Sequence, residues 1–119
     1  MNRETDKLAR RLMVLSVGTR VRIVQLLKGR ALCVNALAQR LDVTQGAVSQ
    51  HLRVLRDSGL VIDEKRGYYV HYRLNEQTLA AWREVIYQLL DPAAGACTNK
   101  KGAKKCAAVM KRKKAAKKR

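Results

Sequence analysis

The chain has 119 residues, and its 26 Lys and Arg against 9 Asp and Glu give a formal net charge of +17. This length allows one compact domain with a modest core. The sequence contains no transmembrane run, no signal peptide, no paired catalytic carboxylates and no Gly-rich phosphate loop, so we expect a cytoplasmic protein without a membrane partner that is not an enzyme.

The first part of the chain predicts two helices. Residues 5–15 carry one apolar face made by Leu8, Leu12 and Leu15. Gly18 and Thr19 mark a break and the cap of a new helix. This second helix covers residues 20–28 and stops at Gly29. It belongs at the centre of the fold, because apolar residues surround most of its circumference, namely Val21, Ile23, Val24, Leu26 and Leu27.

Two further helices follow with a tight turn between them. The third covers residues 34–41 and turns four residues inward: Val34, Leu37, Ala38 and Leu41. Asp42 and Val43 form the turn of a helix-turn-helix, and Thr44 can cap the fourth helix. The apolar stripe of this fourth helix consists of Val48, Leu52 and Leu55.

The outer face of the fourth helix is small and hydrogen-bonding rather than densely charged. Such a surface suits the major groove of DNA, where Gln, Ser and Arg can meet base edges and small residues permit close approach. With the capping threonine, the candidate DNA-binding residues on this helix are Thr44, Gln45, Gly46, Ala47, Ser49, Gln50 and Arg53.

A basic β-hairpin is predicted directly after that helix. Gly59 ends the helix in a left-handed conformation, residues 60–62 form a strand, and residues 63–67 form the turn. The second strand, residues 68–74, is expected to bury one face made by Tyr68, Val70, Tyr72 and Leu74. Two cations at the tip, Lys65 and Arg66, are candidates to contact phosphates or the minor groove, with a solvated turn as the alternative.

A last helix and a basic tail complete the chain. Asn75 can cap a helix that continues to Leu90, where Asp91 and Pro92 stop it. The predicted order is therefore ααααββα in one domain over residues 1–91. Residues 92–119 form a Lys/Ala-rich tail with two cysteines, which we expect to be disordered when free. Its 11 basic residues from Lys100 onward predict salt-sensitive affinity for DNA, or else a solubilising role.

Three stretches resemble the ArsR/SmtB transcriptional repressors of bacteria and archaea. They are LSVGTRVRIVQLL at 15–27, LCVNALAQRLDVTQGAVSQHLRVLRDSGLV at 32–61 and KRGYYVHYRL at 65–74. The resemblance covers about residues 5 to 90. It implies a mainly α winged helix-turn-helix that dimerises through its first and last helices and binds an inverted-repeat operator in double-stranded DNA. The interface candidates are Leu8, Leu12, Leu79, Trp82, Ile86 and Leu89, although Trp82 fits a core position in its own chain equally well.

Three cysteines bear on what such a repressor would sense. Cys33 precedes the third helix, whose N-terminus favours thiolate. The resemblance implies a Cys-Val-Cys site for trivalent arsenic or antimony here, but Asn35 stands where the second cysteine would be. Cys97 and Cys106 could complete a three-thiolate site, because a flexible segment up to Cys106 spans on the order of 20 Å. The alternatives are a small buried residue at Cys33 and two unpaired thiols in the tail.

The sequence therefore predicts a repressor that an inducer releases from its operator. DNA binding would need no cofactor, and As(III) or Sb(III) is the first choice of inducer. Alternatives are a thiol redox or persulfide sensor, a repressor without an effector, and a nucleoid-associated architectural protein that coats DNA. We expect His51 to be a partly buried packing residue and His71 to point outward to solvent or phosphate. A second metal site of the family, made of Asp and His on the last helix, has no counterpart here.

Overall fold

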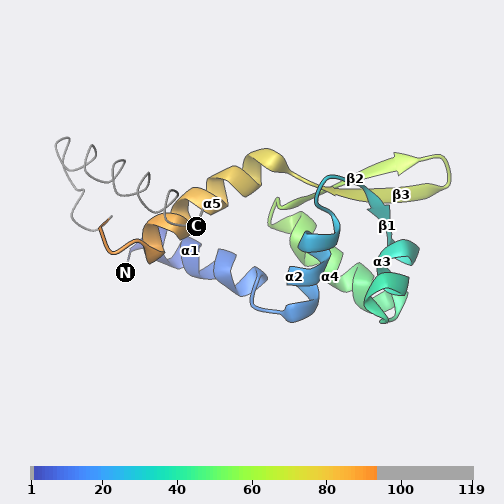
Figure 1. The fold of residues 1–119 in the computed structure, drawn as a ribbon, viewed down its shortest axis with the longest axis horizontal. Coiled ribbons are helices and arrows are strands. Elements are labelled where there is room, and N and C mark those ends of the chain that lie inside the picture. The colour runs from blue at the N-terminus through green and yellow to red at the C-terminus, as the bar shows by residue number, and fades with distance from the viewer. Residues whose placement is uncertain (1, 94–119) are drawn as a thin grey trace, which may run out of the picture. The chain divides into compact units, whose positions relative to one another are not determined.

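The computed structural model describes residues 2–93 (Figure 1). Along the chain the elements are α1 (Arg3–Val14), α2 (Gly18–Leu26), β1 (Leu32–Cys33), α3 (Val34–Leu41), α4 (Gln45–Asp57), β2 (Val61–Arg66), β3 (Tyr69–Leu74) and α5 (Glu76–Leu90). The predicted helices with a β-hairpin before the last helix are confirmed. The chain divides into two compact units, Met1–Trp82 and Arg83–Arg119. None of the helices in the described part is long and apolar enough to cross a membrane.

Both of the first two helices begin earlier than the sequence predicts. The side chain of Asn2 accepts a hydrogen bond from the Glu4 N–H at 2.9 Å and so starts α1 at Arg3. Helix α2 starts at Gly18 without a side-chain cap, so the prediction that Thr19 caps it is wrong. Glycine is tolerated at this position because the first N–H groups of a helix have no intrahelical partner.

The core of the first unit is built from α2, α3, α4 and the start of β2. Its fully buried side chains are Ile23, Leu27, Leu37, Val48, Leu52, Leu55, Leu60 and Val61. The predicted inward stripe of α4 is thus confirmed, as are Leu37, Ala38 and Leu41 of α3. Helix α2 buries only one face, with Val21 37% exposed, which corrects the expectation that the apolar residues around most of its circumference place this helix at the centre of the fold.

The turn between α3 and α4 has the geometry that a helix-turn-helix needs. Asp42 lies in the left-handed region at φ 56°, where the short polar side chain of aspartate is tolerated better than most. The Val43 N–H then donates to the Ala38 carbonyl at 3.2 Å and closes the end of α3. The Thr44 hydroxyl accepts from the Ala47 N–H at 3.1 Å, as predicted, and caps α4.

We expect Thr44→Ala to lower the free energy of unfolding by about 1 kcal/mol, because one N–H at the start of α4 loses its partner. Thr44→Ser keeps the hydroxyl and serves as the matched control. Urea unfolding without DNA measures both variants. Equal stability of the alanine and serine variants would contradict the capping role.

The sheet has three antiparallel strands in the order β1–β3–β2. Strand β1 was not predicted, because two residues are too few to show an alternating pattern. Strand β2 continues to Arg66, which pairs with Tyr69, so the turn predicted over residues 63–67 shrinks to Gly67 and Tyr68. The ladder is held there by Glu64, whose carboxylate accepts from Arg73 at 2.8 Å and from Arg66 at 3.2 Å.

Burial along β3 decreases toward the tip of the hairpin. Leu74 is buried, Val70 is 38% exposed, and Tyr68 at the turn is completely exposed. The predicted buried face is therefore wrong for the outer half of the strand. The physical reason is that the hairpin extends past the helices (Figure 1), so no hydrophobic surface covers its far end.

Helix α5 begins as predicted and contributes its first half to the first unit. The Asn75 side chain accepts from the Thr78 N–H at 3.4 Å, and Gly59 adopts the predicted left-handed conformation at φ 89°. Trp82 is 5% exposed, and the guanidinium of Arg11 lies 5.7 Å from the centre of its ring. In the second unit, Gln88 donates to Glu84 at 3.0 Å along the same helix.

Candidate nucleic-acid interface

The outer face of α4 is a polar surface that the core leaves uncovered. Because Val48, Leu52 and Leu55 hold one side of the helix in the core, the opposite side faces solvent. All but one of the predicted DNA-binding residues on α4 are exposed, and Ala47 is half-buried. A Cβ added to Gly46 would meet nothing nearer than the Thr44 hydroxyl at 4.0 Å. The start of α4 therefore offers polar side chains with open space in front of them.

Asn35 is a site residue that sequence reasoning considered only as a missing cysteine. Its side-chain oxygen accepts a hydrogen bond from the Gln45 amide at 3.2 Å, which ties the start of α3 to the start of α4. The amide of Gln45 is thus engaged within the chain, whereas no bond within residues 2–93 holds the side chains of Gln50 and Arg53. These two remain the most available groups for base edges on the helix.

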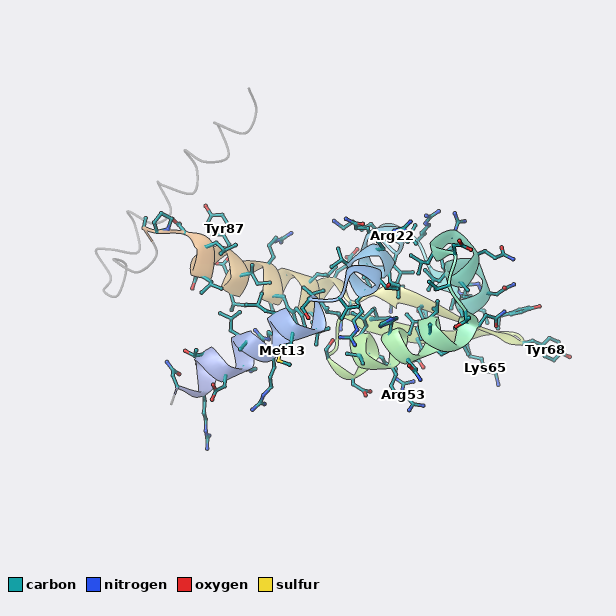
Figure 2. All side chains as sticks on the ribbon, turned by 90° about the horizontal axis from the view of Figure 1, so that it is seen from below. Met13, Arg22, Arg53, Lys65, Tyr68 and Tyr87 are labelled. Carbon is teal, nitrogen blue, oxygen red and sulfur yellow. The ribbon has the colours of Figure 1, made fainter. Side chains whose placement is uncertain are left out.

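The tip of the hairpin presents one unpaired cation and two exposed aromatic rings. Lys65 has no carboxylate partner among residues 2–93, whereas Arg66 pairs with Glu64. The Tyr68 side chain is fully exposed and that of Tyr69 is 64% exposed. The alternating pattern of this strand placed Tyr68 on the face expected to be buried and Tyr69 on the outer face, and neither tyrosine was predicted to bind DNA. Figure 2 shows Arg53 and Lys65 on the same side of the first unit.

Ion pairs stiffen the hairpin and its junction with α4. Arg56 near the end of α4 lies 3.5 Å from Asp63 in β2. The hydrogen bonds from Arg73 and Arg66 hold the pKa of Glu64 below its ordinary value. Because these side chains are largely exposed, each pair adds little to stability. Among residues 2–93, the Arg56–Asp63 pair is the one that connects α4 to the hairpin, whereas the two pairs of Glu64 lie within the hairpin.

His51 links α4 to α2 on the inner side of the recognition-type helix. Its Nδ1 atom accepts a hydrogen bond from Arg20 Nε at 3.2 Å, so it is a half-buried packing residue, as expected. Burial, and then the positive charge of Arg20, lower the pKa of His51 below 6.5. Both causes disfavour imidazolium in the folded chain.

We expect the folded state to lose stability as pH falls below about 6.5, because the unfolded chain then binds a proton that folded His51 resists. The stability that neutral His51 contributes is fully present above that pH. It is lost as the pH falls through the lowered pKa of His51 in the folded chain. Urea unfolding at pH values on both sides of this range measures it. In His51→Gln the pH dependence should flatten, and an unchanged slope in that variant would contradict the assignment.

The candidate cysteine site is only partly contained in the described residues. Cys33 is half-buried at the end of β1, is the N-cap residue of α3, and pairs across the sheet with His71. His71 is itself half-buried, and its Nδ1 atom has no hydrogen-bond partner among residues 2–93, which corrects the expectation of a solvated side chain. No three His, Cys, Asp or Glu side chains within residues 2–93 gather as metal ligands. Cys97 and Cys106 lie outside the described residues.

The predicted interface residues differ in how far the single chain covers them. In α1, Leu12 is 38% exposed and its neighbour Met13 67% exposed, and no residue of this helix is fully buried. Three of the candidates are half-buried, namely Leu8, Leu79 and Ile86. Leu89 is 52% exposed. Trp82 is buried in its own chain, as the alternative interpretation of this residue predicts.

Comparison with known proteins agrees with this architecture. The sequence signature described as "Bacterial regulatory protein, arsR family" matches residues 18–63. A crystal structure described as a possible transcriptional regulator for arsenical resistance is 39% identical, with a TM-score of 0.64, and the match covers 71% of this chain and 88% of that one. The chain belongs to the ArsR family. The matched residues of the signature include α2, α3 and α4, the elements that build and present the polar face.

Two further proteins are similar to this ArsR-family chain. The arsenical resistance operon repressor of Escherichia coli is 46% identical over 74 residues, which are 61% of this chain and 62% of that repressor. The chain thus spans less than two thirds of that relative's length. A structure of reduced HlyU from Vibrio cholerae is 32% identical with a TM-score of 0.61, covering 73% of this chain and 92% of that chain.

Proposed function

We propose that this chain is a homodimeric transcriptional repressor that binds an inverted-repeat operator in double-stranded DNA. The observation that carries the proposal is the exposed outer face of α4, where Ser49, Gln50 and Arg53 project from a helix whose other side is fixed in the core. Gln and Arg side chains on such a helix can make paired hydrogen bonds to adenine and guanine edges in the major groove. The β2–β3 hairpin, which is the wing of the fold, adds Lys65 and the exposed ring of Tyr68 beside the DNA backbone or the minor groove.

A second copy of the chain is the partner that the exposed apolar side chains of α1 and α5 favour. Leu12 and Met13 of α1 remain exposed, as do Leu89 and Leu90 of α5. Burying apolar surface of this kind favours association by about 25 cal/mol per Å². Two identical protein faces also match the two half-sites of a symmetric operator. Sedimentation velocity should show a dimer, and Met13→Glu should shift it toward the monomer.

The proposed inducer is trivalent arsenic or antimony bound by cysteine thiolates. The relatives described as arsenical resistance regulators support this choice. The described residues supply one thiol, that of Cys33, so a three-thiolate site would also need Cys97 and Cys106. Cys33 is the N-cap residue of α3 and pairs with His71 in β3 of the hairpin. This position supports a coupling between a bound metalloid and the proposed DNA-contacting hairpin. Two residues later, Asn35 holds Gln45 at the start of α4.

We expect arsenite to release wild-type protein from its operator under reducing conditions, and we expect no release of the variant with serine at Cys33, Cys97 and Cys106. Fluorescence anisotropy with labelled operator measures both. Serine is nearly the same size as cysteine but is not a soft ligand, so DNA affinity without arsenite should stay within about twofold. Arsenite-dependent release that survives in the serine variant would exclude a thiolate site.

Thiol oxidation or persulfidation is the second candidate signal. The similarity to reduced HlyU favours it, because that description names a redox state of the relative. In this case an oxidant or a persulfide donor releases the operator, arsenite does not, and Cys33→Ser abolishes the response. The same binding assay therefore distinguishes the two signals, with arsenite added in one case and an oxidant or a persulfide donor in the other.

A further inference from the structure

A cavity of about 620 Å³ that is open to solvent lies within the first unit, away from the outer face of α4. Three segments line it: one face of α1, the C-terminal end of α4, and the first two turns of α5. Its lining residues are Lys7, Arg10, Arg11, Val14, Asp57, Ser58, Gln77, Thr78, Ala81 and Trp82. A volume of this size matches the range of pockets that hold small organic ligands.

The charge of the lining selects for an anion. Lys7, Arg10 and Arg11 recur at helical spacing and so present three cations from one face of α1. No carboxylate among residues 2–93 lies within ion-pair distance of any of them. Asp57 is the one acidic lining residue, is 69% exposed, and lies 3.9 Å from Arg56. Three cations against one carboxylate leave the cavity with a positive balance.

The remaining walls suit a ligand with an apolar body. Val14, Ala81 and Trp82 are the apolar residues of the lining. One carbonyl group at the C-terminal end of α4 has a partner within the chain, because the Ser58 hydroxyl donates a hydrogen bond to the Leu55 carbonyl at 2.7 Å. Gln77 and Thr78 come from the first turn of α5, where the helix dipole favours negative charge.

We propose that this cavity binds a small amphipathic organic anion, with a carboxylate, sulfonate or phosphate group against Lys7, Arg10 and Arg11 and a ring or short chain against Val14, Ala81 and Trp82. The bound anion acts as an effector, a role that rests on the proposed function. Its contacts join α1 and α5, the proposed dimer helices, to the end of the DNA-contacting helix α4. A ligand with different affinities for two arrangements of these helices changes operator affinity.

The test uses anilinonaphthalene sulfonate, an amphipathic organic anion whose fluorescence accepts energy from tryptophan. Trp82 is the only tryptophan of the chain, so energy transfer reports on probe bound near this cavity. We expect saturable binding with one probe per subunit. In the double variant Lys7→Gln/Arg10→Gln the affinity should fall about tenfold, because charge-assisted contacts are lost. The control Arg3→Gln/Arg22→Gln removes the same charge outside the cavity and should bind within about twofold of wild type.

A neutral probe and a variant that fills the cavity complete the test. Phenylnaphthylamine, the related neutral probe, should bind much more weakly, and Ala81→Leu should block the anionic probe by filling the cavity without changing its charge. Equal affinity of the two double variants, or equal binding of the neutral probe, would overturn the anion site. The effector role predicts that saturating probe changes operator affinity of wild type but not of the Lys7→Gln/Arg10→Gln variant, and no change would overturn that role. Failure of the protein to bind any operator would instead overturn the proposed function and leave the cavity result standing.

Discussion

Replacing Gln50 and Arg53 together with alanine should weaken operator binding about 100-fold or more. Both side chains are exposed on the outer face of α4, and no bond within residues 2–93 holds them. A well-placed base contact contributes about 1–3 kcal/mol of discrimination, so two such contacts account for a loss of this size. Binding to unrelated DNA should fall only a few-fold, because there Arg53 contributes one charge among many.

Fluorescence anisotropy with operator and with scrambled DNA of the same length measures this double variant. A matched control is Arg22→Ala, which removes an exposed cation on the opposite side of the first unit from Arg53 in Figure 2. This control should keep the preference for operator. If the double variant weakened binding equally on both DNAs, α4 would contact the backbone only, and an architectural role would explain the data better.

Leu52→Ala should lower the free energy of unfolding by about 2–5 kcal/mol, which is a large share of the total for a domain of this size. Leu52 is 1% exposed on the inner side of α4 and packs in the core of the first unit. Truncation leaves a cavity that the surrounding helices can fill only in part. Urea unfolding followed by circular dichroism measures the change.

The two α4 variants are expected to separate stability from DNA recognition. Leu52→Ala loses stability but keeps operator preference at low temperature, whereas the Gln50/Arg53 double variant keeps stability and loses the preference. Truncation of either exposed side chain creates no cavity, so its effect on unfolding should stay within about 0.5 kcal/mol. A double variant that unfolded as readily as Leu52→Ala would show that its DNA defect is a folding defect.

Sequence patterns alone predicted core residues and helix starts correctly where the pattern is local and repeated. Helical spacing predicted Val48, Leu52 and Leu55 as core, and the hydroxyl of Thr44 predicted the start of α4. Both signals depend on neighbours within a few positions along the chain, so no knowledge of the tertiary fold was needed.

The errors arose where tertiary contacts decide the outcome. The alternation in β3 does not reveal that the hairpin extends past the helices, so Tyr68 was expected inside although it is fully exposed. Strand β1 exists only because Leu32 and Cys33 meet β3 from a distant part of the sequence. The bond from Gln45 to Asn35 likewise depends on the angle between α3 and α4. The cationic cavity joins residues from α1, α4 and α5, and the helical spacing of its three cations in α1 does not reveal which residues lie opposite them.

Sequence-selective DNA binding can be measured directly with the full chain. The full chain is titrated into labelled DNA from upstream of its own gene and into a scrambled version, near physiological salt, with and without arsenite in a reducing buffer. We expect at least about 1000-fold tighter binding to the upstream DNA, in line with specific repressors, and loss of that preference with arsenite. Equal affinity for both DNAs, unchanged by arsenite, would contradict this expectation.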